Sequence, residues 1–191
     1  DITGDVVDGA ILTGLITPGR GTVGSFPTTN LSGTTTSTWT ASAGSTTVGT
    51  GTIEVGNGVV SDTFAISLTA GLPVTVTLQA NPPSQTVGDS SALTATVVDQ
   101  YGNAVANNTG VSFASNIGGP IAPASTTNGI ATSSISSTLV GTAFITATSG
   151  SASGSATVVF TSGLPFTVTL QANPPSQTVG ASSALTATVV D

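Results

Sequence analysis

The sequence predicts an all-β protein built from tandem β-sandwich units, and three observations lead to this fold class. Residues 71–99 return 92 residues later as residues 163–191, with Val74 replaced by Phe166 and Asp89 by Ala181 as the two changes. A near-copy at a fixed offset is typical of a repeat array. Apolar residues alternate with Thr and Ser in short segments, which is the period of a half-buried strand. No segment shows a helical period.

The repeat divides the chain at two Gly-Leu-Pro linkers. We expect residues 71–162 to form one complete unit and residues 163–191 to be the first strands of a further unit. Residues 1–70 are interpreted as a diverged unit that lacks its first strand. The matching segments are 48–58 with 140–150, 33–42 with 129–138, and 1–8 with 92–99. The predicted array is therefore incomplete at both ends of the chain.

The complete unit contains about seven short strands with turns roughly every 8–12 residues, a pattern typical of an Ig-like sandwich. Asn81-Pro82-Pro83 is expected to end or bend the first strand, because proline cannot donate to a sheet ladder. Gly150-Ser151 is expected to be a hairpin turn. Six of these strands are expected near residues 74–80, 93–97, 111–113, 130–137, 142–148 and 156–161. The predicted core side chains are Leu78, Leu93, Val97, Phe113, Ile145 and Val158.

The same unit resembles the bacterial Ig-like domains of the invasin and intimin type. The resemblance is carried by residues 93–99, Tyr101-Gly102-Asn103, Val111-Ser112-Phe113, Asn128-Gly129 and 141–148. It covers the complete unit well, the C-terminal segment strongly and the first 70 residues loosely. It implies an Ig-like β-sandwich in an extracellular surface protein, usually repeated as a stalk, with no catalytic residues to carry over.

Composition excludes several classes of partner. The net charge is −7, and Arg20 is the single basic residue of the chain. Binding to nucleic acid or to an anionic membrane surface requires clustered Lys and Arg, so both are excluded. The chain has no Cys, and therefore no disulfide, and no apolar run approaches the roughly 18 residues of a membrane span. No basic, apolar leader precedes Asp1, and we expect any signal peptide to lie outside this segment.

Enzymatic chemistry has little support in the sequence. The many Ser and Thr residues have no His, Lys or Cys beside them to act as an activating base. Asp1, Asp5 and Asp8 are the densest carboxylates, but they fall on a predicted strand and its turn. Calcium would require clustered oxygen ligands, which Asp99 with Asn103, or Asp5 with Asp8, would supply only in part. We favour turn formation for Asp99 and Asn103, and expect neither a metal, nor a cofactor, nor an enzyme.

Three further residues carry specific expectations. Trp39, the single tryptophan, is expected in a core or between sheets, and the alternative is a platform for stacking a sugar. Asn30 and Asn107 begin N-glycosylation sequons, although such triplets also occur by chance in chains rich in Ser and Thr. Intramolecular isopeptide bonds, which need a Lys amine, are excluded.

We predict a structural segment of an extracellular fibre or stalk at the cell surface. Its partners would be adjacent Ig-like repeats or copies of itself, with glycans as a further expectation. The alternative is an adhesin or carbohydrate-binding module that uses the loops at one end of a sandwich.

Two arrangements of the chain ends stay open. Either the units belong to one covalent array, or a strand with Phe166, Val168 and Leu170 enters the open edge of a neighbouring subunit. Against strand addition, residues 184–191 repeat the strand expected at residues 1–8. In both cases residues 163–191 should not pair with the strands of residues 71–162.

Overall fold

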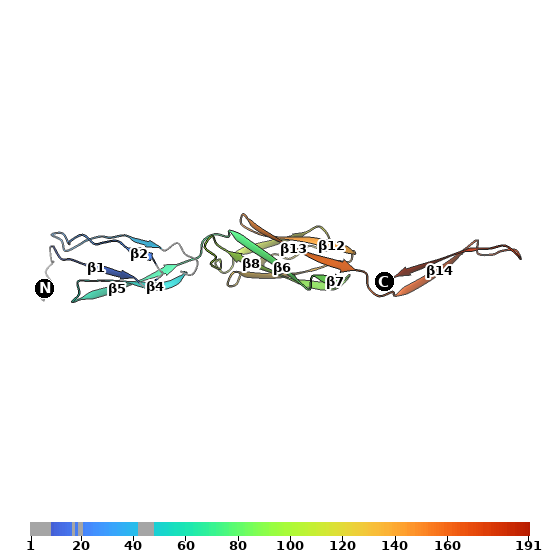
Figure 1. The fold of residues 1–191 in the computed structure, drawn as a ribbon, viewed down its shortest axis with the longest axis horizontal. Helices are drawn as coiled ribbons and strands as arrows, with labels where there is room; N and C mark the ends of the chain where they lie inside the picture. The colour runs from blue at the N-terminus through green and yellow to red at the C-terminus, as the bar shows by residue number, and fades with distance from the viewer. Residues whose placement is uncertain (1–8, 17, 19–20, 42–47) are drawn as a thin grey trace.

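A computed structural model of the chain describes residues 9–16, 18, 21–41 and 48–191. The expectations for Asp1, Asp5, Asp8 and Arg20 concern residues outside these ranges. Within them the secondary structure consists of strands and turns without a helix, which confirms the all-β class. A first unit, a central sandwich and a C-terminal hairpin follow one another along the long axis of the molecule (Figure 1).

The central sandwich consists of two sheets. One sheet has the strand order β11-β8-β6 and the other has the order β10-β9-β12-β13-β7. The strands are β6 (Thr75–Asn81), β7 (Ser84–Thr86), β8 (Ser90–Val98), β9 (Gly110–Ser115), β10 (Ala124–Ser125), β11 (Ile130–Ser136), β12 (Gly141–Ser149) and β13 (Ala152–Thr161). Gly150 and Ser151 form the predicted two-residue hairpin turn between β12 and β13.

The core between these two sheets contains every side chain that the alternating pattern predicted. Leu93, Val97, Ile145 and Val158 are fully buried, and Leu78 and Phe113 are also buried; all six belong to one cluster. Residues on one face of a strand recur every second position, so the apolar half of each strand forms this layer.

The two prolines after β6 move the chain from one sheet to the other. The strand ends at Asn81, and β7 then pairs in parallel with β13 of the opposite sheet. Proline has no N–H to continue the ladder, so the strand stops there as predicted. The hydroxyl of buried Ser91 donates to the carbonyl of Pro82 at 2.6 Å and fixes this crossing. The change of sheet itself was not predicted.

A glycine allows the two sheets to approach closely where β13 passes β6. A Cβ atom on Gly154 would lie 2.2 Å from the carbonyl oxygen of Val76 and 3.4 Å from the backbone nitrogen of Leu78. Such distances are possible only without a side chain, so Gly154 sets the spacing of the sandwich at this edge.

The first unit repeats part of this arrangement. β4 (Gly49–Gly56) pairs with β5 (Ser61–Leu68) in the register that β12 and β13 show 92 residues later. β1 (Thr13–Ile16) pairs with β4 as β9 pairs with β12. A second, two-stranded sheet contains β2 (Gly21–Val23) and β3 (Trp39–Ala41). The predicted match of residues 1–8 to β8 lies outside the described residues.

The C-terminal hairpin repeats the first two long strands of the sandwich. β14 (Thr167–Asn173) pairs with β15 (Ala184–Val190) in the register of β6 with β8, each partner shifted by 92. The sheet of β14 and β15 contains no strand of the central sandwich. The prediction that residues 163–191 do not pair with their own chain's sandwich is confirmed.

Candidate functional site

The turn after β8 holds a buried carboxylate at the end of the sandwich that faces the first linker. Asp99 is 3% exposed, and its Oδ1 accepts the backbone N–H groups of Tyr101 at 2.8 Å and Asn103 at 2.9 Å. Its Oδ2 accepts the backbone N–H of Gly71 at 2.9 Å and the side-chain amide of Asn103 at 3.0 Å. Asp99 and Asn103 therefore act as turn formers, which is the interpretation that the sequence favoured.

The electrostatics of this carboxylate follow from the same contacts. Burial alone would raise the pKa of Asp99, but the hydrogen bonds from Gly71, Asn103 and Tyr101 outweigh burial and lower the pKa from 3.8 to about 2. Donors already point at both carboxylate oxygens, so the lone pairs that a cation would need are engaged. The carboxylate therefore has the geometry of a structural turn, while the buried Oδ1 of Asn103 accepts no hydrogen bond from the residues that the structure describes.

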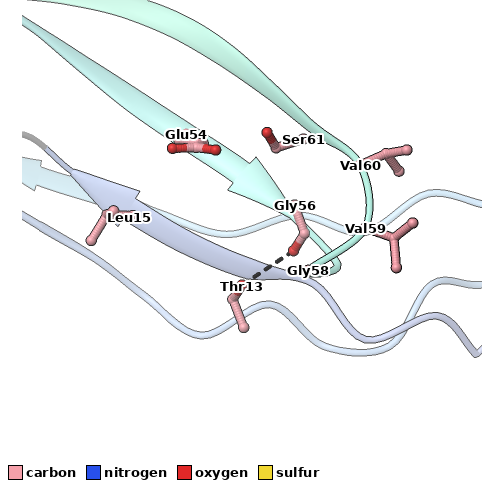
Figure 2. Close-up of a pocket in the computed structure, with 8 residues that line it drawn as sticks. All are labelled: Thr13, Leu15, Glu54, Gly56, Gly58, Val59, Val60 and Ser61. Atoms are coloured by element: carbon pink, nitrogen blue, oxygen red, sulfur yellow. Dashed lines mark hydrogen bonds between the residues drawn. The ribbon is translucent and has the colours of Figure 1, made fainter.

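A shallow groove lies at the end of the first unit, between β1 and the β4–β5 hairpin. Its volume is about 290 Å³, just below the roughly 300–1,000 Å³ of ordinary ligand pockets. Figure 2 shows three of its lining residues, Leu15 on β1 and Val59 and Val60 in the β4–β5 turn, and the hydrogen bond from the Thr13 hydroxyl to the Gly56 carbonyl, which is 3.2 Å long. Glu54 is its one ionisable side chain, so the groove contains no acid–base pair.

Aromatic side chains do not gather into a sugar-binding platform in the part of the chain that the structure describes. The exposed aromatic residues are Phe64 on β5, Tyr101 in the turn, Phe144 on β12 and Phe166 before β14. Trp39 on β3 is half-buried and pairs with Val23 of β2. Within the described ranges, no group of three or more His, Cys, Asp or Glu residues could hold a metal ion.

The asparagines of both sequons are exposed. The Oδ1 of Asn30 accepts the backbone N–H groups of Ser32 and Thr34, and the Oδ1 of Asn107 accepts the backbone N–H of Asn128. These three hydrogen bonds use the amide oxygen, whereas a glycan would be attached to the nitrogen. Both positions stay candidates for modification.

The C-terminal hairpin exposes the face that its counterpart buries. Val168 and Leu170 are 68% and 66% exposed, whereas their counterparts Val76 and Leu78 on β6 are 5% and 7% exposed. Phe166 is 86% exposed, and its counterpart Val74 is itself 55% exposed. The hairpin therefore presents an apolar face ready to be covered by the remaining strands of a sandwich.

The proteins similar to this chain are found among solved structures. No protein-family model matches the sequence, and the search of curated proteins finds no match. FdeC, described as a broadly conserved Escherichia coli adhesin, is similar at 16% identity and a TM-score of 0.70, over 100% of this chain and 66% of that one. InvD of Yersinia pseudotuberculosis is similar at 25% identity and a TM-score of 0.62, over 95% of this chain and 57% of that one.

Invasin, described as a bacterial integrin-binding protein, is similar at 22% identity and a TM-score of 0.49, over 90% of this chain and 37% of that one. The chain thus spans less than two thirds of the length of each of these three structures. FdeC and InvD carry the comparison of folds, and the resemblance to bacterial Ig-like domains of the invasin and intimin type is confirmed at the level of the fold. The described ranges contain no helix of the length and hydropathy that a membrane span requires.

Proposed function

We propose that the chain is a structural segment of an extracellular stalk at a bacterial cell surface, with its Ig-like modules joined end to end and without enzymatic activity. The observation that carries this proposal is the repeated register: β14 and β15 begin a further module with the same pairing that begins the central one. A repeat of one structural unit along a chain is the construction of a quasi-one-dimensional support.

The dimensions and surface chemistry support this role. β13 has ten residues, and a strand of that length spans about 33 Å, so each module adds a length of that order. The surface carries few charges, with 5% charged residues and Arg20 as the one basic residue. Such a surface offers little for ionic capture of partners. Glycans at Asn30 and Asn107 belong to this proposal.

Small-angle scattering and a glycan array on the same preparation of the full chain test the function. A stalk segment should give an elongated monomer without glycan binding. A specific glycan signal would instead favour the second class of function, an adhesin or carbohydrate-binding module. A compact particle would contradict the end-to-end arrangement.

Strand addition between subunits is the second candidate for how units are joined. It is favoured by unfilled apolar surface in the first unit, because Phe64 is 72% exposed whereas its counterpart Ala156 packs against the sandwich core. Ile53 is half-buried, whereas its counterpart Ile145 is fully buried. A strand like β14, taken from another copy, would cover such a face.

One residue opposes that docking geometry. Asp62 on β5 occupies the position that Gly154 occupies on β13, since both pair with the equivalent residue of the preceding strand. A strand placed as β6 is placed would bring a carbonyl oxygen to about 2.2 Å from the Cβ of Asp62, the distance found at Gly154. We therefore prefer the covalent array to strand addition.

The variant Asp62→Gly separates the two joining mechanisms. If Asp62 keeps a β14-like strand out, the variant should self-associate at concentrations where the parent chain is monomeric in analytical ultracentrifugation. Asp62→Asn removes the charge but keeps the side chain and serves as the matched control. A parent chain that already forms head-to-tail oligomers would overturn our preference for the covalent array.

A further inference from the structure

The carboxylate of Asp99 binds a linker that lies 28 residues earlier in the chain. The Gly71 N–H donates to Oδ2 at 2.9 Å, and the Gly71 backbone lies against the Asp99 side chain, to which an added Cβ would come within 3.5 Å. The backbone N–H groups of Tyr101 and Asn103 donate to Oδ1, so the turn itself fixes the orientation of the carboxylate that accepts the Gly71 N–H. A charge-assisted hydrogen bond to a buried carboxylate is among the stronger bonds that a backbone N–H can donate.

This bond shortens the unanchored part of the linker between the first unit and the sandwich. Six residues, 69–74, connect β5 to β6. Because Gly71 is tied to Asp99, only residues 69 and 70 remain between the last strand of the first unit and an anchored point. Pro73, whose ring fixes its φ, lies beside Gly150 of the β12–β13 turn and limits the rest of the linker.

The same contact recurs at the second linker. The Gly163 N–H donates to Oδ2 of Asp191, which is the counterpart of Asp99. Five residues, 162–166, connect β13 to β14, and the contact leaves Ser162 alone between β13 and the anchored glycine.

We propose that Asp99 and Asp191 are latch residues, each of which clamps the Gly-Leu-Pro linker onto the module that follows it and thereby sets the stiffness of the joint between modules. The clamp confines the joint to one or two residues, and the orientation of neighbouring modules then depends on very few backbone dihedral angles. The benefit of a stiff joint rests on the stalk function proposed above. The clamping of the joint itself does not depend on that function.

Amide hydrogen exchange measured by NMR on the full chain tests the clamp directly. In Asp99→Asn the exchange of the Gly71 amide should quicken by about tenfold or more, the loss expected for a charge-assisted hydrogen bond, while Gly163 stays unchanged. Asp191→Asn should show the reverse. Asp89→Ala is the matched control, because Asp89 is exposed and the second copy carries Ala181 at this position.

Small-angle scattering on the double variant, Asp99→Asn with Asp191→Asn, then measures the combined effect on both joints. We expect a broader distribution of molecular dimensions than in the parent chain or in Asp89→Ala. If Asp99→Asn unfolds the sandwich, Asp191→Asn decides the question, because β14 and β15 share no sheet with the sandwich. Unchanged exchange of Gly163 in that variant, or unchanged dimensions in a folded double variant, would overturn the proposal. If the dimensions broaden but the chain binds glycans, the latch stands and the stalk function fails.

Discussion

Replacing Gly154 with alanine should separate the two sheets of the central sandwich. The new Cβ would lie 2.2 Å from the Val76 carbonyl oxygen and 2.9 Å from its carbonyl carbon. Comfortable contacts of a carbon atom begin near 3.5 Å, so β13 and β6 must part locally by about 1 Å. Both contacting atoms belong to the backbone of a paired strand, and no side-chain rotation relieves them.

The expected cost follows from two opposing terms. Overpacking a well-packed site costs about 1–3 kcal/mol, and a rigid backbone contact belongs at the upper end. Alanine also lowers the conformational entropy of the unfolded chain, which stabilises the folded state by about 0.4–1 kcal/mol. The net loss is about 2 kcal/mol, which lowers the melting temperature of a module of this size by about 10 °C.

The chain contains its own reporters and its own control for this measurement. Tyr101, the single tyrosine, lies in the sandwich, and Trp39, the single tryptophan, lies in the first unit, so their emission follows the two parts separately. Gly110→Ala is the control, since a Cβ there meets no atom within 4 Å. Gly110→Ala should be neutral or slightly stabilising. A Gly154→Ala variant that melts at or above the parent temperature would refute the role assigned to this glycine.

Two further predictions concern the sandwich. Because the pKa of Asp99 is lowered to about 2 in the folded state from 3.8, its contribution to stability is complete above about pH 4 and is lost as the pH falls toward 2; Asp99→Asn should show a flatter stability curve in this window by urea titration. A steep acid loss that Asp99→Asn retains would assign the effect to other carboxyl groups. Ile145→Ala, at a fully buried site, should lower the free energy of unfolding by about 3 kcal/mol in urea denaturation. Ile130→Ala, at a site that is 45% exposed, should lower it by less than about 1 kcal/mol. Equal losses in the two variants would contradict the assigned core.

The sequence predicted the core well because strand burial is a local pattern. Alternation along β8 and β12 places Leu93, Val97 and Ile145 on one face whatever strand pairs beside them. The internal repeat added the correspondence of β4–β5 with β12–β13, which composition alone would not reveal.

Contacts between distant segments were not predictable in the same way. Ser84–Thr86 has no apolar alternation, and it becomes β7 only because Val159–Thr161 lies beside it in the folded sandwich. Buried Ser149 bonds the carbonyl of Gly110, a partner 39 residues away. The turn role of Asp99 was visible in its neighbours, but its bond to Gly71 depends on the fold and was missed.

In the covalent array that we propose, the difference between Asp62 and Gly154 would keep near-identical segments from exchanging strands. Two segments that share all but two residues, 71–99 and 163–191, compete for the same kind of acceptor, and strand exchange between identical elements is a general hazard of repeats. The sandwich admits its own β6 because Gly154 leaves room for the Val76 carbonyl. The first unit has a carboxylate at that position, and an inward charge on an exposed edge is a known means of blocking strand addition. On this proposal, specificity at this edge would depend on the acceptor strands, β5 and β13, which differ, rather than on the donor strands, which are nearly identical.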